Sequence, residues 1–228
     1  MVYAVSALIA AALVAAALLY WELVIVEGAH LGTRVVAALY DLAASRYERI
    51  KQFDLEHETG TLGWPLTEVL AEAPAPRVLD VACGTARLAR ALLREPAFDG
   101  DVVGVDLAAR MLRAGRPLCA AWPGRVSWAQ AEAASLPFAA GAFDAVTCLE
   151  ALEFFPDARA ALAECLRVLR PGGVLVVTNR IGWEARLMPG KSFSRAAFAR
   201  LLAALPLQQV EILPWQVEYD LAWARKLV

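Results

Sequence analysis

Residues 77–92 read RVLDVACGTARLARAL and are the most informative segment of the sequence for the type of fold. An apolar run that ends at Val81 is followed by five small residues, 82–86, and then by a helix-like pattern of apolar and charged residues. Many folds hold a nucleotide where a strand breaks into a tight loop at the start of a helix. The stretch therefore predicts a nucleotide-binding α/β domain.

The same alternation continues along the chain. Strand-like apolar runs cover 78–81, 102–105, 126–128, 145–149 and 174–178, and helix-like stretches cover 86–94, 108–118 and 158–169. Pro171, Gly172 and Gly173 predict a turn before the fifth strand. A helix over 192–205, capped by Ser192 or Ser194, and strands over 208–213 and 217–222 follow. This order predicts a doubly wound, mostly parallel, seven-stranded sheet with helices on both faces.

Composition limits the range of functions. A chain of 228 residues suits one α/β domain with an appendage. The net charge of −2, with acids and bases interspersed, argues against a nucleic-acid partner. Four scattered cysteines form no C-x-x-C pair and the two histidines lie far apart, so neither a metal site nor a disulfide framework is expected. Reduced thiols in a cytosolic domain fit this pattern.

The N-terminal segment differs from the rest of the chain. Residues 2–21, VYAVSALIAAALVAAALLYW, carry no charge, and as a helix they would span about 30 Å, roughly one hydrocarbon core. Tyr20 and Trp21 fall where an interfacial aromatic belt is expected. A cleaved signal peptide and an apolar helix docked on a partner are alternatives, but no basic region precedes the run and it is long for a signal. The segment predicts a membrane-anchor helix.

The anchor defines the expected organisation of the chain: an anchor over 1–27, a helical cap and linker over 28–76, and a cofactor-binding domain over 77–228. Residues 28–58 have a helical pattern, 59–65 form a turn-rich break, and 66–73 form a short helix. Arg34, Arg46, Arg49 and Lys51 follow the anchor, whereas no basic residue precedes it. The positive-inside rule then predicts a single-pass protein with its domain in the cytoplasm.

The loop at 82–86 does not fit the dinucleotide fingerprint G-x-G-x-x-G. Alignment on Gly84 puts Arg87 at the third glycine, where a side chain would separate helix from strand. The carboxylate of Asp80 would also repel a pyrophosphate. An NAD-dependent oxidoreductase is therefore a weak alternative. An acid in this place suits a ligand with a positive group.

The segment VLDVACGTARLA resembles the first motif of the class I S-adenosyl-L-methionine (SAM)-dependent methyltransferases, an acid followed by x-G-x-G-x-G. The motif positions here are Asp80, Ala82, Gly84 and Ala86, so alanine replaces two of the three glycines. The resemblance implies a Rossmann-like fold and SAM as the cofactor.

Three further motifs follow in the family's order. VVGVDLAARML ends its strand at Asp106, which by resemblance would bind the ribose, although Asp106 could instead cap the next helix. AEAASLPFAAGAFDAV resembles the adenine-binding segment, with Glu132 where an aspartate is usual and the backbone N–H of Ala133 facing the ring. RVLRPGGVLVVT matches the turn and fifth strand. The resemblance implies these cofactor-binding residues: Asp80, Ala82, Cys83, Gly84, Asp106, Leu107, Met111, Glu132, Ala133 and Leu149.

Among the subgroups, the chain most resembles the ubiquinone/menaquinone-biosynthesis methyltransferases. Residues 40–50, YDLAASRYERI, are similar to the Tyr-rich helix that covers the cofactor there, so Tyr47 could cover the cofactor or belong to the core. Methyl transfer needs alignment and exclusion of water more than catalytic side chains. Glu150 and Glu153 are candidate catalytic residues, with solvated helix-start charges as the alternative. His57 is a candidate base, with an ordinary surface histidine as the alternative.

The expected acceptor is a small molecule, lipidic or otherwise membrane-associated, because the anchor would raise the local concentration of such substrates. No Asn/Asp-Pro-Pro-Tyr segment follows the fourth strand, which argues against a nucleic-acid acceptor. The alternative from another class is a non-catalytic SAM-binding scaffold at the membrane, suggested by the altered motif residues Ala82, Ala86 and Glu132.

Overall fold

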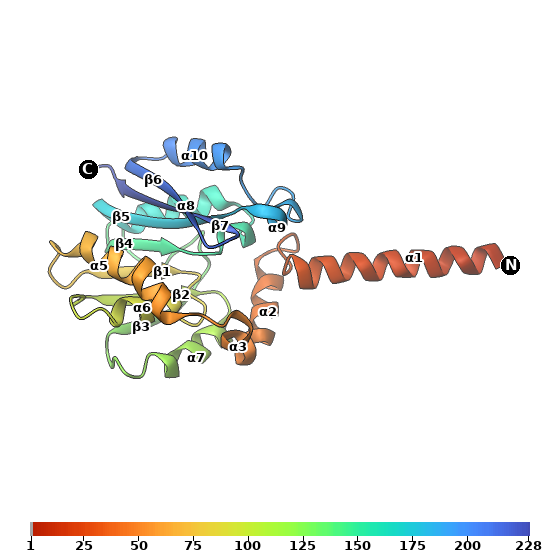
Figure 1. Ribbon diagram of the computed structural model, residues 1–228, viewed down its shortest axis with the longest axis horizontal. Coiled ribbons are helices and arrows are strands. Elements are labelled where there is room, and N and C mark those ends of the chain that lie inside the picture. Colours follow the sequence, from red (N-terminus) through yellow and green to blue (C-terminus); the bar gives the residue numbers. More distant parts are fainter. Residues whose placement is uncertain (1) are drawn as a thin grey trace.

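The computed structural model describes residues 2–228. Its centre is a seven-stranded sheet of order β3-β2-β1-β4-β5-β7-β6 (Figure 1). The strands are β1 (Arg77–Val81), β2 (Asp101–Asp106), β3 (Val126–Gln130), β4 (Phe143–Cys148), β5 (Leu169–Arg180), β6 (Leu207–Trp215) and β7 (Tyr219–Lys226). Among the described residues, only β7 runs against the others, between β5 and β6. The predicted mostly parallel sheet is confirmed.

Helices cover both faces of the sheet because successive side chains of each buried strand point to opposite sides. Leu79 and Val81 pack with α8 (Ala158–Val168) and α10 (Arg195–Ala203). Val78 packs with α5 (Trp64–Leu70) and α6 (Arg87–Leu93). The remaining long helix of the sheet region, α7 (Ala109–Leu118), packs on β2 and β3. Burial on both faces explains why these strands have continuous apolar sequences.

Three predicted elements differ from the structure. The turn expected at 171–173 lies inside β5, where the pairing with β4 shifts between Phe143 and Ala145 and Gly172 has a φ of +73°. The helix expected over 28–58 is broken into α2 (Thr33–Ala43), η2 (Ala44–Arg46), α3 (Tyr47–Lys51) and α4 (Leu55–Glu58). Gln52 in the left-handed conformation ends α3, and the Asp54 carboxylate caps α4 through two backbone N–H groups. The turn-rich break expected over 59–65 is helical, because η3 (Thr59–Gly63) continues from α4 and runs into α5. Ser194 caps the N-terminus of α10, which confirms one of the two expected capping residues.

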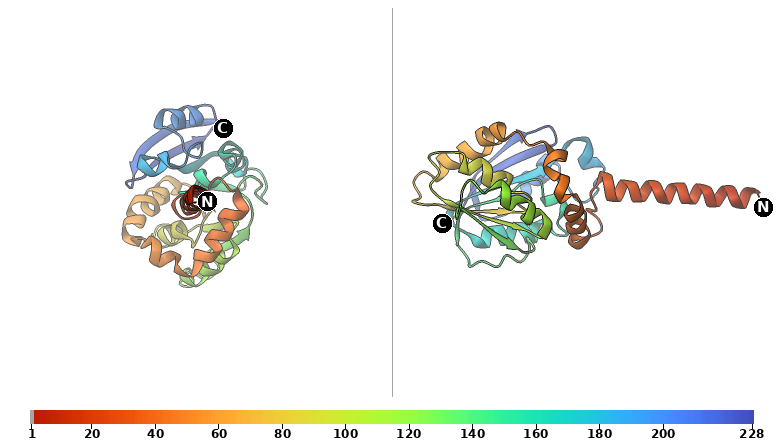
Figure 2. Two further views of the ribbon diagram at one scale, coloured as in Figure 1. Left: turned by 90° about the vertical axis from the view of Figure 1, so that its right-hand side faces the viewer. Right: turned by 90° about the horizontal axis from the view of Figure 1, so that it is seen from below.

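The N-terminal helix stands clear of the domain (Figures 1 and 2). It comprises α1 (Val2–Tyr20) and a π-helical turn η1 (Trp21–Ile25). The 23 residues Tyr3–Ile25 have a mean hydropathy of 2.3 over their most apolar window, and none of that window is buried. This helix is long and apolar enough to cross a membrane.

The base of this helix is packed against the domain. Val26 and Ala29 are buried in a cluster with Val36, Phe154 and Met188. Phe154 ends the short helix η4 (Leu152–Phe154) after β4, and Met188 follows α9 (Gly182–Arg186). Buried contacts from three separate parts of the chain hold the helix at the carboxyl edge of the sheet, where the cofactor site was expected.

Candidate cofactor site

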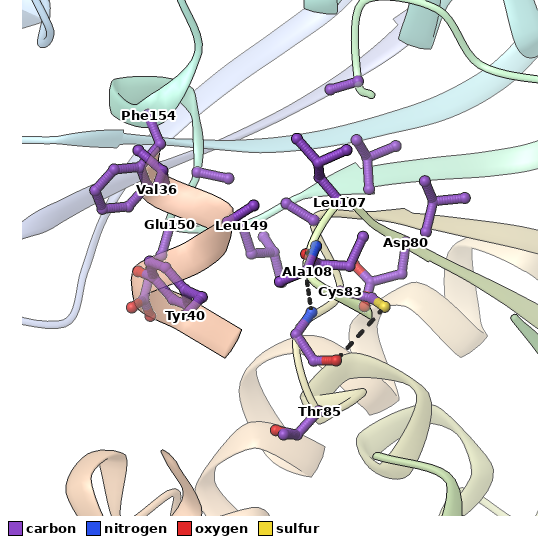
Figure 3. A pocket seen from close by; sticks show the side chains of 18 of the residues that line it. Val36, Tyr40, Asp80, Cys83, Thr85, Leu107, Ala108, Leu149, Glu150 and Phe154 are labelled. Atoms are coloured by element: carbon purple, nitrogen blue, oxygen red, sulfur yellow. Dashed lines mark hydrogen bonds between the residues drawn. The ribbon is translucent and has the colours of Figure 1, made fainter. Parts of the chain in front are cut away.

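A cavity opens at the carboxyl ends of β1, β2 and β4. It measures about 1030 Å³ with its open mouth included, a size that suits a nucleotide-sized ligand. Its polar side is formed by the loops after these strands and its apolar side by the helical cap. Figure 3 shows Val36 and Tyr40 of α2 on one side and Asp80, Cys83 and Ala108 on the other.

The loop after β1 has an unusual backbone. Ala82, Gly84 and Ala86 have φ values of +56°, +54° and +65°, so all three are left-handed. These are the three positions at which the methyltransferase motif has glycine. A left-handed alanine is strained by about 1–2 kcal/mol, which glycine would avoid. The loop therefore keeps the glycine conformation at both positions where the sequence has lost the glycine.

Asp106 fixes this loop from the neighbouring strand. Its Oδ2 accepts a hydrogen bond of 2.8 Å from Gly84 N–H, and its Oδ1 accepts one of 2.8 Å from Ala108 N–H. Burial raises the pKa of this carboxyl, and the two backbone hydrogen bonds oppose the rise. Each carboxylate oxygen can accept a second hydrogen bond, so capacity for two ligand hydroxyls remains. The alternative of helix capping and the ligand role are thus compatible.

Asp80 lies at the bottom of the cavity and is almost fully buried. Burial raises its pKa to about 7, although a 2.7 Å hydrogen bond from the Thr147 hydroxyl favours the ionised form. Arg87 also lowers this pKa, by its positive charge. A positively charged ligand group beside Asp80 would restore full ionisation. Such a carboxyl suits the cationic part of SAM and disfavours a pyrophosphate.

The Cys83 side chain fits beside β2 because the strand residue that faces it, Gly104, has no side chain. A Cβ added to Gly104 would lie 2.8 Å from the Cys83 sulfur. Burial raises the pKa of the Cys83 thiol, so this thiol is a packing group and a poor nucleophile.

The helical cap contributes an aromatic wall. Five aromatic residues line the cavity from α2, α3, the α3–α4 turn and the loop after β4: Tyr40, Tyr47, Phe53, Phe154 and Phe155. The Tyr40 hydroxyl donates a 2.6 Å hydrogen bond to Glu27, and its ring meets Phe154 edge to face. Burial raises the pKa of Tyr47, which keeps this phenol protonated. The wall can exclude water from a bound ligand and accept an apolar one.

A carboxylate from α3 joins the cap to the loop. Glu48 accepts two hydrogen bonds of 2.9 Å from the buried Arg90 guanidinium and one of 2.6 Å from the Thr85 hydroxyl. Thr85 belongs to the left-handed loop and Arg90 to α6. The sequence analysis missed Glu48 because its partners lie 37 and 42 positions away, and no local pattern marks such a pair.

Glu150 lies between two cationic side chains, just after the carboxyl end of β4. Arg87 donates to it at 2.7 Å and Lys51 at 3.4 Å, and Arg87 also lies 3.6 Å from Glu58. Burial disfavours the ionised form of Glu150, but the charges of Arg87 and Lys51 outweigh burial and lower its pKa. Glu150 is therefore an ionised cavity residue with little power as a base.

Most of the expected cofactor residues are brought together by the structure. Those that line the cavity are Asp80, Ala82, Cys83, Gly84, Asp106, Leu107, Glu132, Ala133 and Leu149, together with the candidates Glu150 and Tyr47. Glu132 is exposed at the rim.

Three expected residues lie elsewhere. Met111 is fully buried among Ala44 and Ala108, below Gly84, and is not a lining residue. Its place on α7 turns it toward the core, so it supports the loop from behind. Glu153 is buried against Arg180 at 2.8 Å and accepts from the Tyr219 hydroxyl at 2.7 Å, away from the cavity lining. His57 is exposed on α4 and also does not line the cavity.

Comparison with known proteins agrees with this geometry. Residues 78–173 match a family model described as a methyltransferase domain. A demethylmenaquinone methyltransferase from Thermus thermophilus is 46% identical over 108 residues, which cover 47% of this chain and 48% of that protein. The ubiquinone/menaquinone biosynthesis C-methyltransferase UbiE of Syntrophotalea carbinolica is 38% identical over 145 residues, 61% of this chain and 58% of that protein. The chain thus spans about half to three fifths of the length of these relatives.

Solved structures share the fold at low sequence identity. The [4+2]-cyclase SpnF matches with a TM-score of 0.67 at 20% identity over 86% of this chain and 97% of that one. A SAM-dependent methyltransferase from Aquifex aeolicus matches with a TM-score of 0.58 at 17% identity over 77% of this chain and 100% of that one. Because SpnF is named a cyclase, the fold alone does not define the reaction.

The sheet, the loop after β1 and the match of residues 78–173 to the methyltransferase-domain model support a class I SAM-dependent methyltransferase domain. Within that class, the chain is similar to the methyltransferases of ubiquinone and menaquinone biosynthesis. The expectations of this family and of SAM as its cofactor are confirmed.

Proposed function

We propose that this protein transfers a methyl group from SAM to a quinone-like lipidic acceptor at a membrane surface. The observation that carries the proposal is the pair Asp80 and Asp106, which lie at the carboxyl ends of two neighbouring parallel strands, next to the left-handed loop that follows β1. This pair suits a ligand that has a cationic end, a ribose and no phosphate. SAM, when bound, supplies an electrophilic methyl group on a sulfonium sulfur.

Seven residues of the cavity have a proposed part in holding this ligand. Asp80 balances the positive charge, Asp106 accepts the ribose hydroxyls, and Gly84 allows the backbone to approach closely. Leu107, Ala133 and Leu149 provide the apolar surroundings of the adenine, with Glu132 near its amino group. Their joint presence in one cavity supports these assignments.

The acceptor is proposed to lie against the aromatic wall. Tyr40, Phe53 and Phe154 offer apolar ring surfaces, which suit a planar quinol-type ring. Glu150, ionised beside Lys51 and Arg87, can accept a hydrogen bond from an acceptor hydroxyl and orient it. The names of the relatives, which specify demethylmenaquinone and 2-phytyl-1,4-naphthoquinone, support an acceptor of this class.

The membrane part of the proposal rests on the N-terminal helix. Residues 1–27 would anchor the protein, 28–76 would cap the site and 77–228 would form the catalytic domain on the cytoplasmic side. The apolar span Tyr3–Ile25 and the basic residues after it support this arrangement. Its base adjoins Phe154 in the cavity wall, which would bring a lipid-soluble acceptor close to the site.

The test is a calorimetric titration of the full chain in detergent micelles with SAM, S-adenosylhomocysteine and NAD. We expect micromolar binding of the first two and none of NAD. Asp106→Asn should weaken SAM binding at least about tenfold, because ligand hydrogen bonds to a charged group contribute about 1.5–3 kcal/mol. Asp101→Asn, at the exposed opposite end of the same strand, is the matched control.

The outcomes separate the competing functions. SAM binding followed by methyl transfer to a demethylated quinone would support the proposal. SAM binding without transfer to any lipid acceptor would favour the non-catalytic scaffold. NAD binding in place of SAM would favour the oxidoreductase.

A further inference from the structure

The segment 182–191, which comprises α9 and the loop after it, lies beside the base of the N-terminal helix (Figure 1 and the right view of Figure 2). We propose that this segment is a second membrane contact, which rests on the headgroup region of a lipid bilayer. The inference rests on the proposed function, in which residues 3–25 cross the membrane.

The position of this segment relative to the helix is fixed by direct contacts. The His30 ring makes hydrogen bonds of 3.1 Å to Glu22 at the helix base and 3.2 Å to the Pro189 carbonyl. Met188 is buried with Val26 and Ala29. When the helix enters a bilayer, segment 182–191 is therefore held near the same surface.

The segment is also anchored on the sheet side. Ile181 N–H donates a 2.7 Å hydrogen bond to the Glu218 carbonyl. Gly182 has a φ of +79°, which a residue with a side chain adopts only with strain, and an added Cβ would push the Glu218 carboxylate aside, so glycine is favoured where α9 begins. After the segment, the Asn179 side chain bonds both the N–H and the carbonyl of Phe193 at 3.1 and 2.9 Å. Its surface is thus a defined part of the fold.

The exposed chemistry of this region matches a membrane interface. Trp183 of α9 is 60% exposed, and Leu31 and Ile25 at the helix base are 49% and 39% exposed. Tryptophan is enriched at the headgroup level of membranes because its ring is apolar and its N–H is polar.

The basic side chains of the region suit the same partner. Arg186 of α9 and Arg34 of α2 are both exposed. Their guanidinium groups can donate hydrogen bonds to phosphate groups at the surface of a bilayer. An exposed tryptophan and exposed arginines in the region beside a membrane span fit the headgroup region of lipids.

A contact here would orient the site. Val36, Tyr40 and Phe154 line the cavity and also pack in the cluster of Met188 and the helix base. The aromatic wall is therefore continuous with the proposed membrane-facing surface. A lipid-tailed acceptor could place its ring in the cavity while its tail stays in the bilayer.

The test places a fluorophore at single positions of the full chain. The four native cysteines are buried, so a cysteine introduced at an exposed site can be labelled selectively. The variants are Trp183→Cys at the proposed contact, Leu227→Cys at the opposite end of the domain, and Leu13→Cys in the middle of α1 (Figure 1). Each is reconstituted in vesicles of phosphatidylcholine and phosphatidylglycerol that carry a spin label either at the headgroup or deep in the acyl chain.

We expect the headgroup label to quench the probe at 183 at least about twofold more than the probe at 227, because only the former would lie within the interface. The deep label should quench the probe at 13. Equal quenching at 183 and 227, with position 13 quenched, would overturn the second contact and leave the membrane span intact. Absence of quenching at position 13 would overturn the span and this contact together.

Discussion

Gly84 N–H donates a 2.8 Å hydrogen bond to Asp106 Oδ2, and this bond joins the loop after β1 to the end of β2. The same carboxylate accepts from Ala108 N–H at the start of α7. One side chain therefore fixes two backbone segments that surround the cavity. Its loss should disturb the loop as well as any ligand.

Asp106→Ala is expected to lower the free energy of unfolding by about 1–3 kcal/mol, because two backbone donors lose their acceptor in a partly buried site. Urea unfolding of the full chain in detergent, followed by tryptophan fluorescence, measures the change. Asp101→Ala, exposed at the other end of β2, should change stability by less than about 0.5 kcal/mol. Equal effects of the two variants would contradict a structural role for the Asp106 carboxylate.

Ala82→Gly should stabilise the protein by about 0.5–1 kcal/mol. The left-handed alanine costs about 1–2 kcal/mol, and the extra freedom of glycine in the unfolded chain offsets part of the gain. Ala75→Gly is the matched control, because Ala75 is also left-handed, with a φ of +46°, but is exposed and outside the cavity lining. Both variants should raise the midpoint of unfolding, and only Ala82→Gly should change SAM affinity, tightening it about threefold as the methyl leaves the cavity. Equal SAM affinities would show that Ala82 does not contact the ligand.

SAM binding should weaken as the pH falls below 7. Burial raises the pKa of Asp80 from an ordinary 3.8 to about 7, and only the ionised carboxylate balances a cation. The dissociation constant at pH 6 should therefore be about tenfold higher than at pH 8, because only about a tenth of the free protein is then ionised. Calorimetry across this range measures the change, and Asp80→Asn should bind weakly with no such dependence. A flat profile for the natural protein would contradict the assignment.

The same shift predicts the sign of a stability effect. Between pH 4 and 7 the folded protein binds more protons at Asp80 than the unfolded chain does, since its folded pKa is raised. The contribution of Asp80 to the free energy of unfolding is thus complete below pH 4 and is lost as the pH rises to about 7. Asp80→Asn should remove this decline when unfolding is compared across that window.

Glu48→Ala should lower the free energy of unfolding by about 2 kcal/mol, because Arg90 would remain buried without its counter-charge and Glu48 itself is partly exposed. SAM affinity should fall as well, since Thr85 and the cap lose their connection. Glu56→Ala, an exposed residue of α4, is the control and should leave both measurements unchanged. An unchanged SAM affinity in Glu48→Ala would show that the cap does not stabilise the loop.

Much of the sheet could be predicted from the sequence between residues 77 and 178. The apolar runs of β1, β2 and β4 are continuous because these strands are buried on both faces, and such runs are visible without any partner. The positions of Asp80, Gly84 and Asp106 at strand ends could also be predicted, because parallel strands bring their carboxyl ends to one edge. These three residues therefore predicted the location of the cofactor site.

Several features were not predicted from the sequence, some because of local conformation and others because they depend on distant partners. The breaks in 28–58 arise from Gln52 and Asp54, whose local conformations interrupt a pattern that reads as one helix. The family resemblance implied that Met111 contacts the cofactor, yet the direction of its side chain depends on how α7 packs on the sheet. The position of Glu153 also depends on a distant partner, because its ion pair with Arg180 holds it away from the cavity lining.

Sequence patterns were sufficient to predict the class of fold, the edge of the sheet that holds the site, and a helix apolar enough to cross a membrane. These features follow from hydrophobic periodicity and chain direction, which are local properties. Three features became visible only in the tertiary structure: the left-handed alanines at 82 and 86, the connection of the cap to the loop through Glu48, and the contact of Phe154 with both the helix base and the cavity. Such contacts depend on the geometry of segments far apart in the chain, and no local pattern encodes that geometry.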